Sequence, residues 1–184
     1  MKKVLVGCVL AMGALVAVSE DAAVELKPGL IGEYFDMVDA LEDFPTLAAD
    51  KKPAVRRIDK DVNIDSTDDT FPGTSLSEHF YVRWTGILKV EKDGKYTFYT
   101  ESDDGSRLFI DGKQVVDNGG LHGMEEKEGA VELKAGDHEI KIDMFENEGG
   151  AGCKASWACT GIEKAILPAA KLFHKKDKDL DKDK

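Results

Sequence analysis

Apolar and polar residues alternate with a period of two over most of residues 29–173, and Gly, Asp and Pro interrupt the alternation at short intervals. Successive side chains of a strand point to opposite faces, so this alternation is typical of strands that bury one side. Roughly seven to nine strands are predicted in this way. The faces expected to be buried carry Phe80, Val82 and Trp84; Tyr96, Phe98 and Thr100; Ile140, Ile142 and Met144; and Cys153, Ala155 and Trp157.

Short turns are expected between these strands. Asp111-Gly112 is the strongest hairpin signal, because this dipeptide favours the backbone conformations of a two-residue turn. Residues 135–137, Ala-Gly-Asp, mark a second turn. Short connections of this kind favour an antiparallel arrangement over an α/β fold. The sequence therefore predicts an all-β domain, an antiparallel β-sandwich over residues 29–173.

Residues 36–75 depart from this pattern. They contain three prolines and keep neither the period of a helix nor that of a strand. We expect one helical turn over Met37–Leu41 and a strand over Val55–Ile64. The sequence leaves open whether this segment shapes a ligand pocket or covers the edge of a sheet.

The N-terminus carries two lysines and then an unbroken apolar run from Val4 to Val18. This run suits the core of a signal peptide and is shorter than the roughly 20 residues that cross a bilayer. Small residues at 17 and 19 predict cleavage after residue 19, with a linker over residues 20–28. The expected location is then secreted, periplasmic or cell-envelope, with no membrane insertion after cleavage. A retained membrane anchor and a lipoprotein signal at Cys8 are the alternatives.

The C-terminal residues 174–184 alternate basic and acidic side chains and contain one apolar residue, Leu180. Such a segment buries too little apolar surface to offset the loss of chain entropy on ordering. It is expected to be a short, disordered, charged tail.

Acidic residues outnumber basic ones by 36 to 25, a net charge of −11. This balance repels phosphate backbones and argues against a nucleic-acid partner. It is compatible with calcium, which prefers carboxylate and carbonyl oxygens. Cys153 and Cys159 lie six residues apart on one predicted strand, too far for a disulfide unless the strand bends. No Cys-x-x-Cys pair is present, so a zinc site is not expected.

Asp103 and Asp104 stand side by side before Gly105, between two predicted strands. Two adjacent carboxylates repel each other unless a cation, hydrogen-bond donors or water compensates the charge. A metal site, a catalytic pair and a polar turn are the three interpretations. Catalytic carboxylates of glycosidases face each other about 5–9.5 Å apart across a cleft, which one turn does not provide. No Gly-x-Ser-x-Gly or His-Glu-x-x-His motif is present, so the protein is not expected to be an enzyme.

Several segments together resemble the PA-14 domain, a β-sandwich module first defined in the protective antigen of a bacterial toxin. The resemblance spans nearly all of the chain after the signal peptide. It implies a β-sandwich binding module of the kind found in glycosidases, fungal adhesins and secreted bacterial proteins. The segments that carry it, in order, are GLIGEYF (29–35), FYVRWTGIL (80–88), GKYTFYTESDDGSRLFIDGKQVVD (94–117), LKAGDHEIKIDMFENEGGA (133–151) and SWACTG with ILP (156–168).

The resemblance also implies a ligand site. In the sugar-binding adhesins of this family, the adjacent aspartates are joined by a cis peptide bond and hold calcium, which in turn holds sugar hydroxyls. Carried over to this chain, the metal ligands are Asp103, Asp104 and Asn147, the asparagine of the loop ENEGGAG. Asn118 and the following stretch GGLHG (119–123), with His122 in it, are expected to line a pocket beside the pair, unless His122 simply faces solvent.

Two functions follow as expectations. The first is an exported, non-catalytic module that binds a polysaccharide or cell-surface glycan through calcium. The second is a protein-interaction module or structural spacer of the cell envelope, without sugar binding. Without a sugar ligand, Asp103 and Asp104 either shape a turn, because Asp-Gly is favoured in turns on its own account, or hold a structural calcium ion.

Overall fold

The computed structural model of this chain describes residues 24–182. The signal peptide expected over residues 1–19 lies outside the described residues. Within residues 24–182, no helix is long and apolar enough to cross a membrane.

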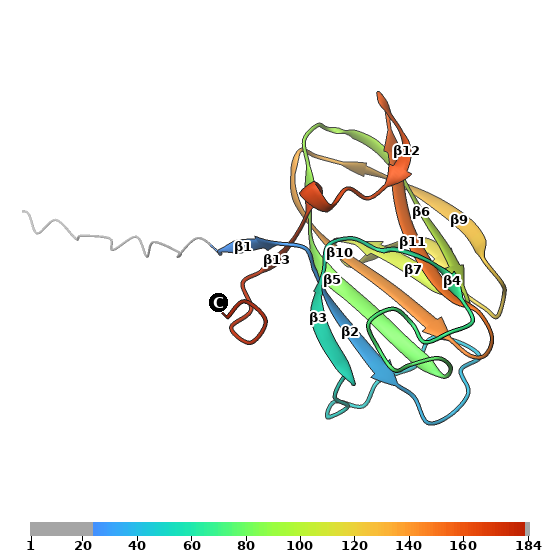
Figure 1. Cartoon of the computed structure of the whole chain (residues 1–184). Helices are drawn as coiled ribbons and strands as arrows, with labels where there is room; N and C mark the ends of the chain where they lie inside the picture. Colours follow the sequence, from blue (N-terminus) through green and yellow to red (C-terminus); the bar gives the residue numbers. More distant parts are fainter. Residues whose placement is uncertain (1–23, 183–184) are drawn as a thin grey trace, which may run out of the picture.

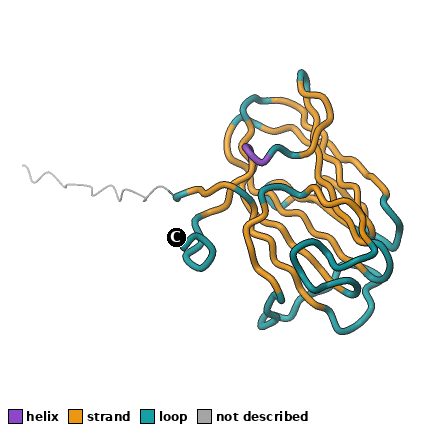
Figure 2. The backbone as a smooth tube through the Cα atoms, in the orientation of Figure 1, coloured by secondary structure: helices purple, strands orange, loops and turns teal. Residues whose placement is uncertain are grey.

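Two antiparallel sheets pack face to face, as predicted, and form a β-sandwich (Figures 1 and 2). Sheet A contains β1 (Leu26–Pro28), β2 (Leu30–Asp36), β3 (Val55–Asp59), β5 (Phe80–Val90), β7 (Ser106–Ile110), β8 (Lys113–Asn118), β10 (Gly136–Glu146) and β13 (Leu172–Lys175). Sheet B contains β4 (Asn63–Thr67), β6 (Gly94–Asp103), β9 (Glu125–Leu133), β11 (Ala151–Cys159) and β12 (Ile162–Ile166). One turn of 3-10 helix, η1 (Ala169–Lys171), precedes β13.

The core lies between the two sheets and contains the predicted apolar faces. All twelve of the residues expected to face inward are buried. Trp84 and Trp157 are 0% and 4% exposed, so both tryptophans pack in the core. Trp84 also donates its indole N–H to Asp59 Oδ2 over 2.9 Å, which satisfies its one polar atom. The hairpin at Asp111-Gly112 forms between β7 and β8, with both turn residues at positive φ.

The structure has more strands than predicted, and the additional ones are short. The single strand expected over Val55–Ile64 is two strands, β3 and β4. They pair with different sheets, since β3 lies beside β2 in sheet A and β4 beside β11 in sheet B. Residues 36–75 therefore cross from one layer to the other.

No helical turn forms over Met37–Leu41. The backbone N–H groups of this stretch bond instead to other loops, Met37 N–H to the His79 carbonyl (2.8 Å) and Leu41 N–H to the Asn147 side chain (3.0 Å). The loop over residues 37–54 lies on sheet A, where an outer apolar cluster forms. Its members are Phe35, Met37, Leu41, Phe44, Leu47, Tyr81 and Phe145. The segment thus covers part of a sheet face rather than only its edge.

The predicted disorder of residues 174–184 is wrong for residues 174–182. His174 is buried in β13 and its Nε2 lies 3.1 Å from the Asp181 carboxylate. Arg56 Nη2 lies 2.7 Å from Asp177 Oδ2, and this contact lowers the pKa of Asp177. Charge pairs and backbone hydrogen bonds hold this segment, whereas the sequence argument considered only apolar burial.

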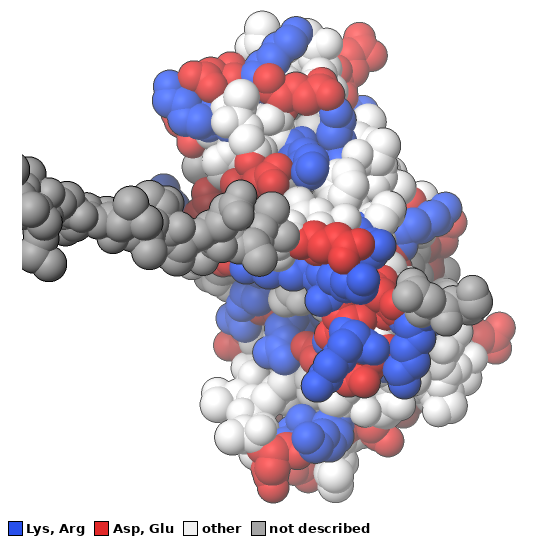
Figure 3. All heavy atoms as spheres, turned by 90° about the vertical axis from the view of Figure 1, so that its left-hand side faces the viewer, with Lys and Arg blue, Asp and Glu red and all other residues white. Residues whose placement is uncertain are grey.

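Acidic and basic side chains are interspersed over the side of the molecule in Figure 3.

Part of the linker expected over residues 20–28 is a strand instead. Residues 26–28 form β1, which pairs antiparallel with β13. The first and last strands of the sandwich therefore lie side by side. β13 itself pairs with the Ile87–Leu88 end of β5, whereas β10 brings Glu146 to Phe80 at the opposite end of β5.

Candidate functional site

The turn between β6 and β7 holds the two adjacent aspartates. The peptide bond between Asp103 and Asp104 is cis. Gly105 follows, and a Cβ atom there would come within 2.4 Å of the Phe145 ring and 3.1 Å of the Gly120 carbonyl oxygen. Only glycine therefore fits at this position without displacing its neighbours. The packing of Gly105 fixes the turn against the strand and loop beside it.

A third carboxylate joins the pair. The register of β7 and β10 places Ser106 opposite Met144, so Asp104 lies beside Glu146, the last residue of β10. One oxygen from each of Asp103, Asp104 and Glu146 lies within 4.8 Å of the other two. Hard divalent cations prefer such a group of carboxylate oxygens.

Glu146 is the most deeply buried member of this carboxylate cluster, with 0% exposure. Its Oε2 accepts the backbone N–H of Asp104 over 3.0 Å, while its buried Oε1 has no hydrogen-bond partner. Burial, together with the negative charges of Asp104 and Asp103, raises the pKa of Glu146 to about 8. Burial and the charge of Asp104 also raise the pKa of Asp103. The cluster thus lacks positive charge, and a proton or a cation can supply it.

Asp104 is held in place by two backbone donors. Its Oδ1 accepts the His122 N–H over 2.9 Å and its Oδ2 accepts the Asn147 N–H over 3.0 Å. Asp103 is more accessible, and its Oδ2 accepts a hydrogen bond from the Ser66 hydroxyl over 3.3 Å. The carboxylate of Asp104 is therefore preoriented, whereas Asp103 is the member of the cluster that solvent reaches.

Asn147, predicted as a metal ligand, takes part through its backbone. Its side-chain oxygen accepts the Leu41 N–H, and its carbonyl oxygen accepts the His79 N–H over 3.0 Å. In this arrangement Asn147 connects Asp104 to the loop over residues 37–54.

Asn118 and His122 lie near the pair, and their side chains are hydrogen-bonded to groups other than the three carboxylates. Asn118 is 1% exposed, and its amide donates to the Glu125 carbonyl over 2.9 Å and to the Ser102 hydroxyl over 3.2 Å. The ring nitrogens of His122 lie against the carbonyl oxygens of Gly123 (2.9 Å) and Asn118 (3.2 Å). The loop does line a hollow through Asn118, Gly119 and Gly120.

Glu146 is the site residue that the sequence argument missed. A signal for it exists, because Glu146 continues the series Ile140, Ile142 and Met144 on the inward face of β10. A carboxylate in phase with buried apolar residues is unusual, since charged groups are rarely buried without a partner.

These features define a β-sandwich domain with a cluster of three carboxylates at one end. The sequence profile of the PA14 domain matches residues 26–171, and the chain belongs to the PA14 domain family. This confirms the resemblance found in the sequence.

Individual relatives come from different kinds of protein. The chain is 31% identical over 147 residues to the anti-sigma-I factor RsgI3 of Acetivibrio thermocellus, a match that covers 79% of this chain and 21% of that protein. A solved anti-sigma factor domain-containing protein from Clostridium clariflavum has a TM-score of 0.68 at 28% identity, covering 82% of this chain and 48% of that one. A PA14 sugar-binding domain from an RTX adhesin has a TM-score of 0.71 at 20% identity, covering 80% and 98%. This chain thus spans about a fifth of the curated relative and about half of the solved anti-sigma chain.

Proposed function

We propose that this PA14 domain is a non-catalytic module that binds carbohydrate through a calcium ion. The observation that carries the proposal is Glu146 Oε1, a buried carboxylate oxygen without a hydrogen-bond partner beside two further carboxylates. A buried charged group without a partner is costly, and a divalent cation would remove that cost.

Asp103, Asp104 and Glu146 would hold the ion. Calcium takes six to eight oxygen ligands, so three carboxylates leave coordination positions for other oxygens, including vicinal hydroxyls of a sugar. The accessible side of Asp103 would be the side from which a sugar approaches. The preoriented carboxylate of Asp104 would keep its position when the ion binds, because two backbone N–H groups already hold it.

The chemistry of the cluster supports binding rather than hydrolysis. The three carboxylates converge within 4.8 Å, whereas the two carboxylates of a glycosidase face each other across the scissile bond at about 5–9.5 Å. The RTX adhesin domain, which is described as sugar-binding, shares the fold of this chain. Together with the expected signal peptide, these points support an exported module that recognises a polysaccharide or a cell-surface glycan.

The similarity to anti-sigma factors supports a second candidate function. In this alternative the sandwich is a protein-interaction module or spacer of the cell envelope, and the carboxylate cluster has only a structural part.

A glycan array, probed with and without calcium chloride, tests the proposal. We expect binding in calcium, loss of binding in EDTA, and loss with Asp104→Asn in both conditions. Asp137→Asn is the matched control, because Asp137 is exposed at the opposite end of β10 from the cluster. An array without signal in either condition would contradict carbohydrate binding and favour the second candidate.

A further inference from the structure

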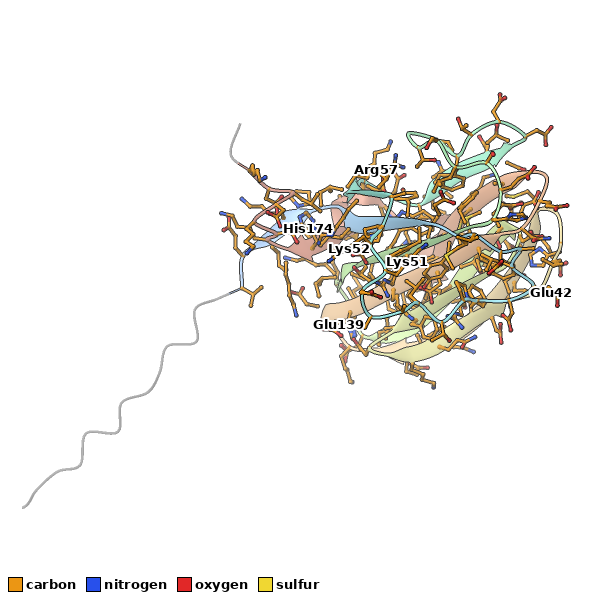
Figure 4. The ribbon with its side chains drawn as sticks, turned by 90° about the horizontal axis from the view of Figure 1, so that it is seen from below. Glu42, Lys51, Lys52, Arg57, Glu139 and His174 are labelled. Carbon is orange, nitrogen blue, oxygen red and sulfur yellow. The ribbon has the colours of Figure 1, made fainter. Side chains whose placement is uncertain are left out.

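A hollow of about 460 Å³, the distal hollow, lies at the end of the sandwich remote from the carboxylate cluster. It lies beside the start of β6 at Gly94, whereas the cluster begins at Asp103, the last residue of the same strand. A strand rises about 3.3 Å per residue, so the two places are about 30 Å apart. In Figure 4, Glu139 lies towards the end with the distal hollow and Glu42 towards the end with the cluster. The volume of the distal hollow is within the range of small-ligand sites.

Apolar side chains form the floor of the distal hollow. The most deeply buried residues that line it are Tyr96 and Trp157, which are 3% and 4% exposed, with ring centroids 5.5 Å apart. Cys159 and Ile162, from the hairpin of β11 and β12, line it nearer to solvent. Sites for small ligands are mostly apolar, with a few polar groups that orient the ligand. The floor therefore suits a ligand with an apolar body.

The turn from β5 to β6 forms a charged wall, and its acidic side chains are already paired. Glu91 forms an ion pair with Lys171 of η1. Asp93 accepts a hydrogen bond from Lys134 Nζ over 2.8 Å and another from the Ala135 N–H over 2.8 Å. These contacts connect the turn to η1 on one side and to the turn between β9 and β10 on the other. The wall is thus held in place, and the charge of its carboxylates is compensated.

Two lysines of the same wall have no such compensation. Lys92 and Lys95 are exposed and line the distal hollow, and their ammonium groups make no ion pair within residues 24–182. The Tyr96 hydroxyl donates to the Lys92 carbonyl oxygen over 2.9 Å, which fixes the backbone of the turn against the floor. The charged residues that line the distal hollow are three lysines and two acids, although the whole chain has a net charge of −11. The wall therefore favours an anionic group and repels a cationic one.

We infer that the distal hollow binds a small apolar carboxylic acid, whose apolar body lies on the aromatic floor and whose carboxylate faces Lys92 and Lys95. The inference is independent of the proposed function, because it involves neither calcium nor the carboxylate cluster. The domain then has a binding site at each end of the sandwich. The distal site lies at the end of β5 that pairs with β13.

A titration followed by amide chemical shifts tests the inference. The probes share a six-carbon chain and differ in charge: hexanoate, hexanol and hexylamine. Hexanoate should cause saturable shifts confined to residues 91–96 and 157–162, hexanol should bind more weakly, and hexylamine should not bind. Absence of saturable shifts there with hexanoate, or hexylamine that binds as tightly as hexanoate, would overturn the inference. Asp104→Asn should bind hexanoate as the wild type does, so this test and the glycan array succeed or fail separately.

Lys92→Gln and Lys95→Gln test the contribution of charge. Each should lower the affinity for hexanoate about threefold, an effect typical of one exposed ion pair, and leave the affinity for hexanol unchanged. Lys113→Gln is the matched control, because Lys113 is exposed and does not line the distal hollow. Equal losses of affinity in all three variants, or no loss in any of them, would contradict a carboxylate bound at the two lysines.

The thiol of Cys159 measures occupancy independently, in protein that carries Cys8→Ser. Cys153 is buried, and burial raises the pKa of its thiol to about 12, so it reacts slowly in the folded protein. The uncharged reagent 4,4′-dithiodipyridine should modify Cys159 about fivefold more slowly when hexanoate occupies about four fifths of the protein, because only the unoccupied fraction reacts. An unchanged rate would place hexanoate outside the distal hollow and overturn the inference.

Discussion

The backbone N–H of Asp104 bonds to the side chain of Glu146 over 3.0 Å, although the two residues lie 42 positions apart in the chain. The register of β7 against β10 creates this contact. It leaves the other oxygen of Glu146 buried without a partner. Four predictions follow from this cluster and from the segments around it.

Calcium should raise the melting temperature of the wild type. If the ion binds the folded state alone, calcium at about 100 times its dissociation constant adds about 2.7 kcal/mol, or about 5–10 °C. Asp104→Asn should abolish the rise, and Asp137→Asn should keep it. Differential scanning calorimetry in calcium and in EDTA measures both. Identical transitions of the wild type in the two solutions would contradict the metal site.

In EDTA, the stability of the protein should fall as the pH rises from about 5 to 8. Burial and the charges of the two aspartates raise the pKa of Glu146 to about 8, so in this window the folded state keeps a proton that the unfolded state has lost. The unfolded state therefore binds fewer protons in this window, and the free energy of unfolding decreases with pH. The total effect of this one group is a few kcal/mol, by the linkage between pKa and stability.

Glu146→Gln should remove most of this slope, while Glu139→Gln, exposed on the same strand, should preserve it. Urea unfolding at several pH values provides the measurement. If the free energy of unfolding fell with pH equally in the wild type and in Glu146→Gln, the pKa of Glu146 would not be raised in the folded state. Calcium should counteract the loss of stability, because the ion competes with the proton for the same oxygens.

Asn147→Ala should show whether the Asn147 side chain supports the loop over residues 37–54 or binds the metal ion. Its side-chain oxygen accepts the Leu41 N–H and so holds this loop in place. We therefore expect the free energy of unfolding to fall by about 1 kcal/mol and amide exchange in the loop over residues 37–54 to become faster. The calcium-induced rise in melting temperature should persist. Loss of that rise would instead make Asn147 a metal ligand, as the resemblance to sugar-binding adhesins implied.

Asp181→Ala should destabilise the C-terminal segment. His174 is buried and lies 3.1 Å from the Asp181 carboxylate, which also accepts the Asp177 N–H over 2.8 Å. We expect a loss of about 1–2 kcal/mol and early proteolytic cleavage after Lys175, since a buried polar group loses its partner. Asp179→Ala is the control, because Asp179 is exposed and its side chain has no such contacts. Equal stability and cleavage of the two variants would contradict an ordered C-terminal segment.

Period-two alternation was sufficient to predict the sandwich and its buried faces, because β5, β6, β10 and β11 are long strands with one side in the core. Asp103 and Asp104 were identifiable because two like charges in a turn require a physical explanation. Glu146 had only the weaker signal of its place in the inward-facing series of β10. Its contact with Asp104 depends on the pairing of β7 with β10, two strands that β8 and β9 separate in the chain. The path of residues 36–75 and the ordered C-terminal segment depend on contacts such as Arg56–Asp177, which local patterns do not encode.

The pairing of β1 with β13 also bears on how the domain can be attached to other protein. Leu26 and Lys175 are neighbours in this pairing, at the end of β5 remote from Glu146. Polypeptide that precedes β1 and polypeptide that follows β13 would therefore connect to the domain at the same end of the sandwich. The opposite pole, with the acidic turn, would then project outward whether the domain is inserted within a longer protein or joined at one end.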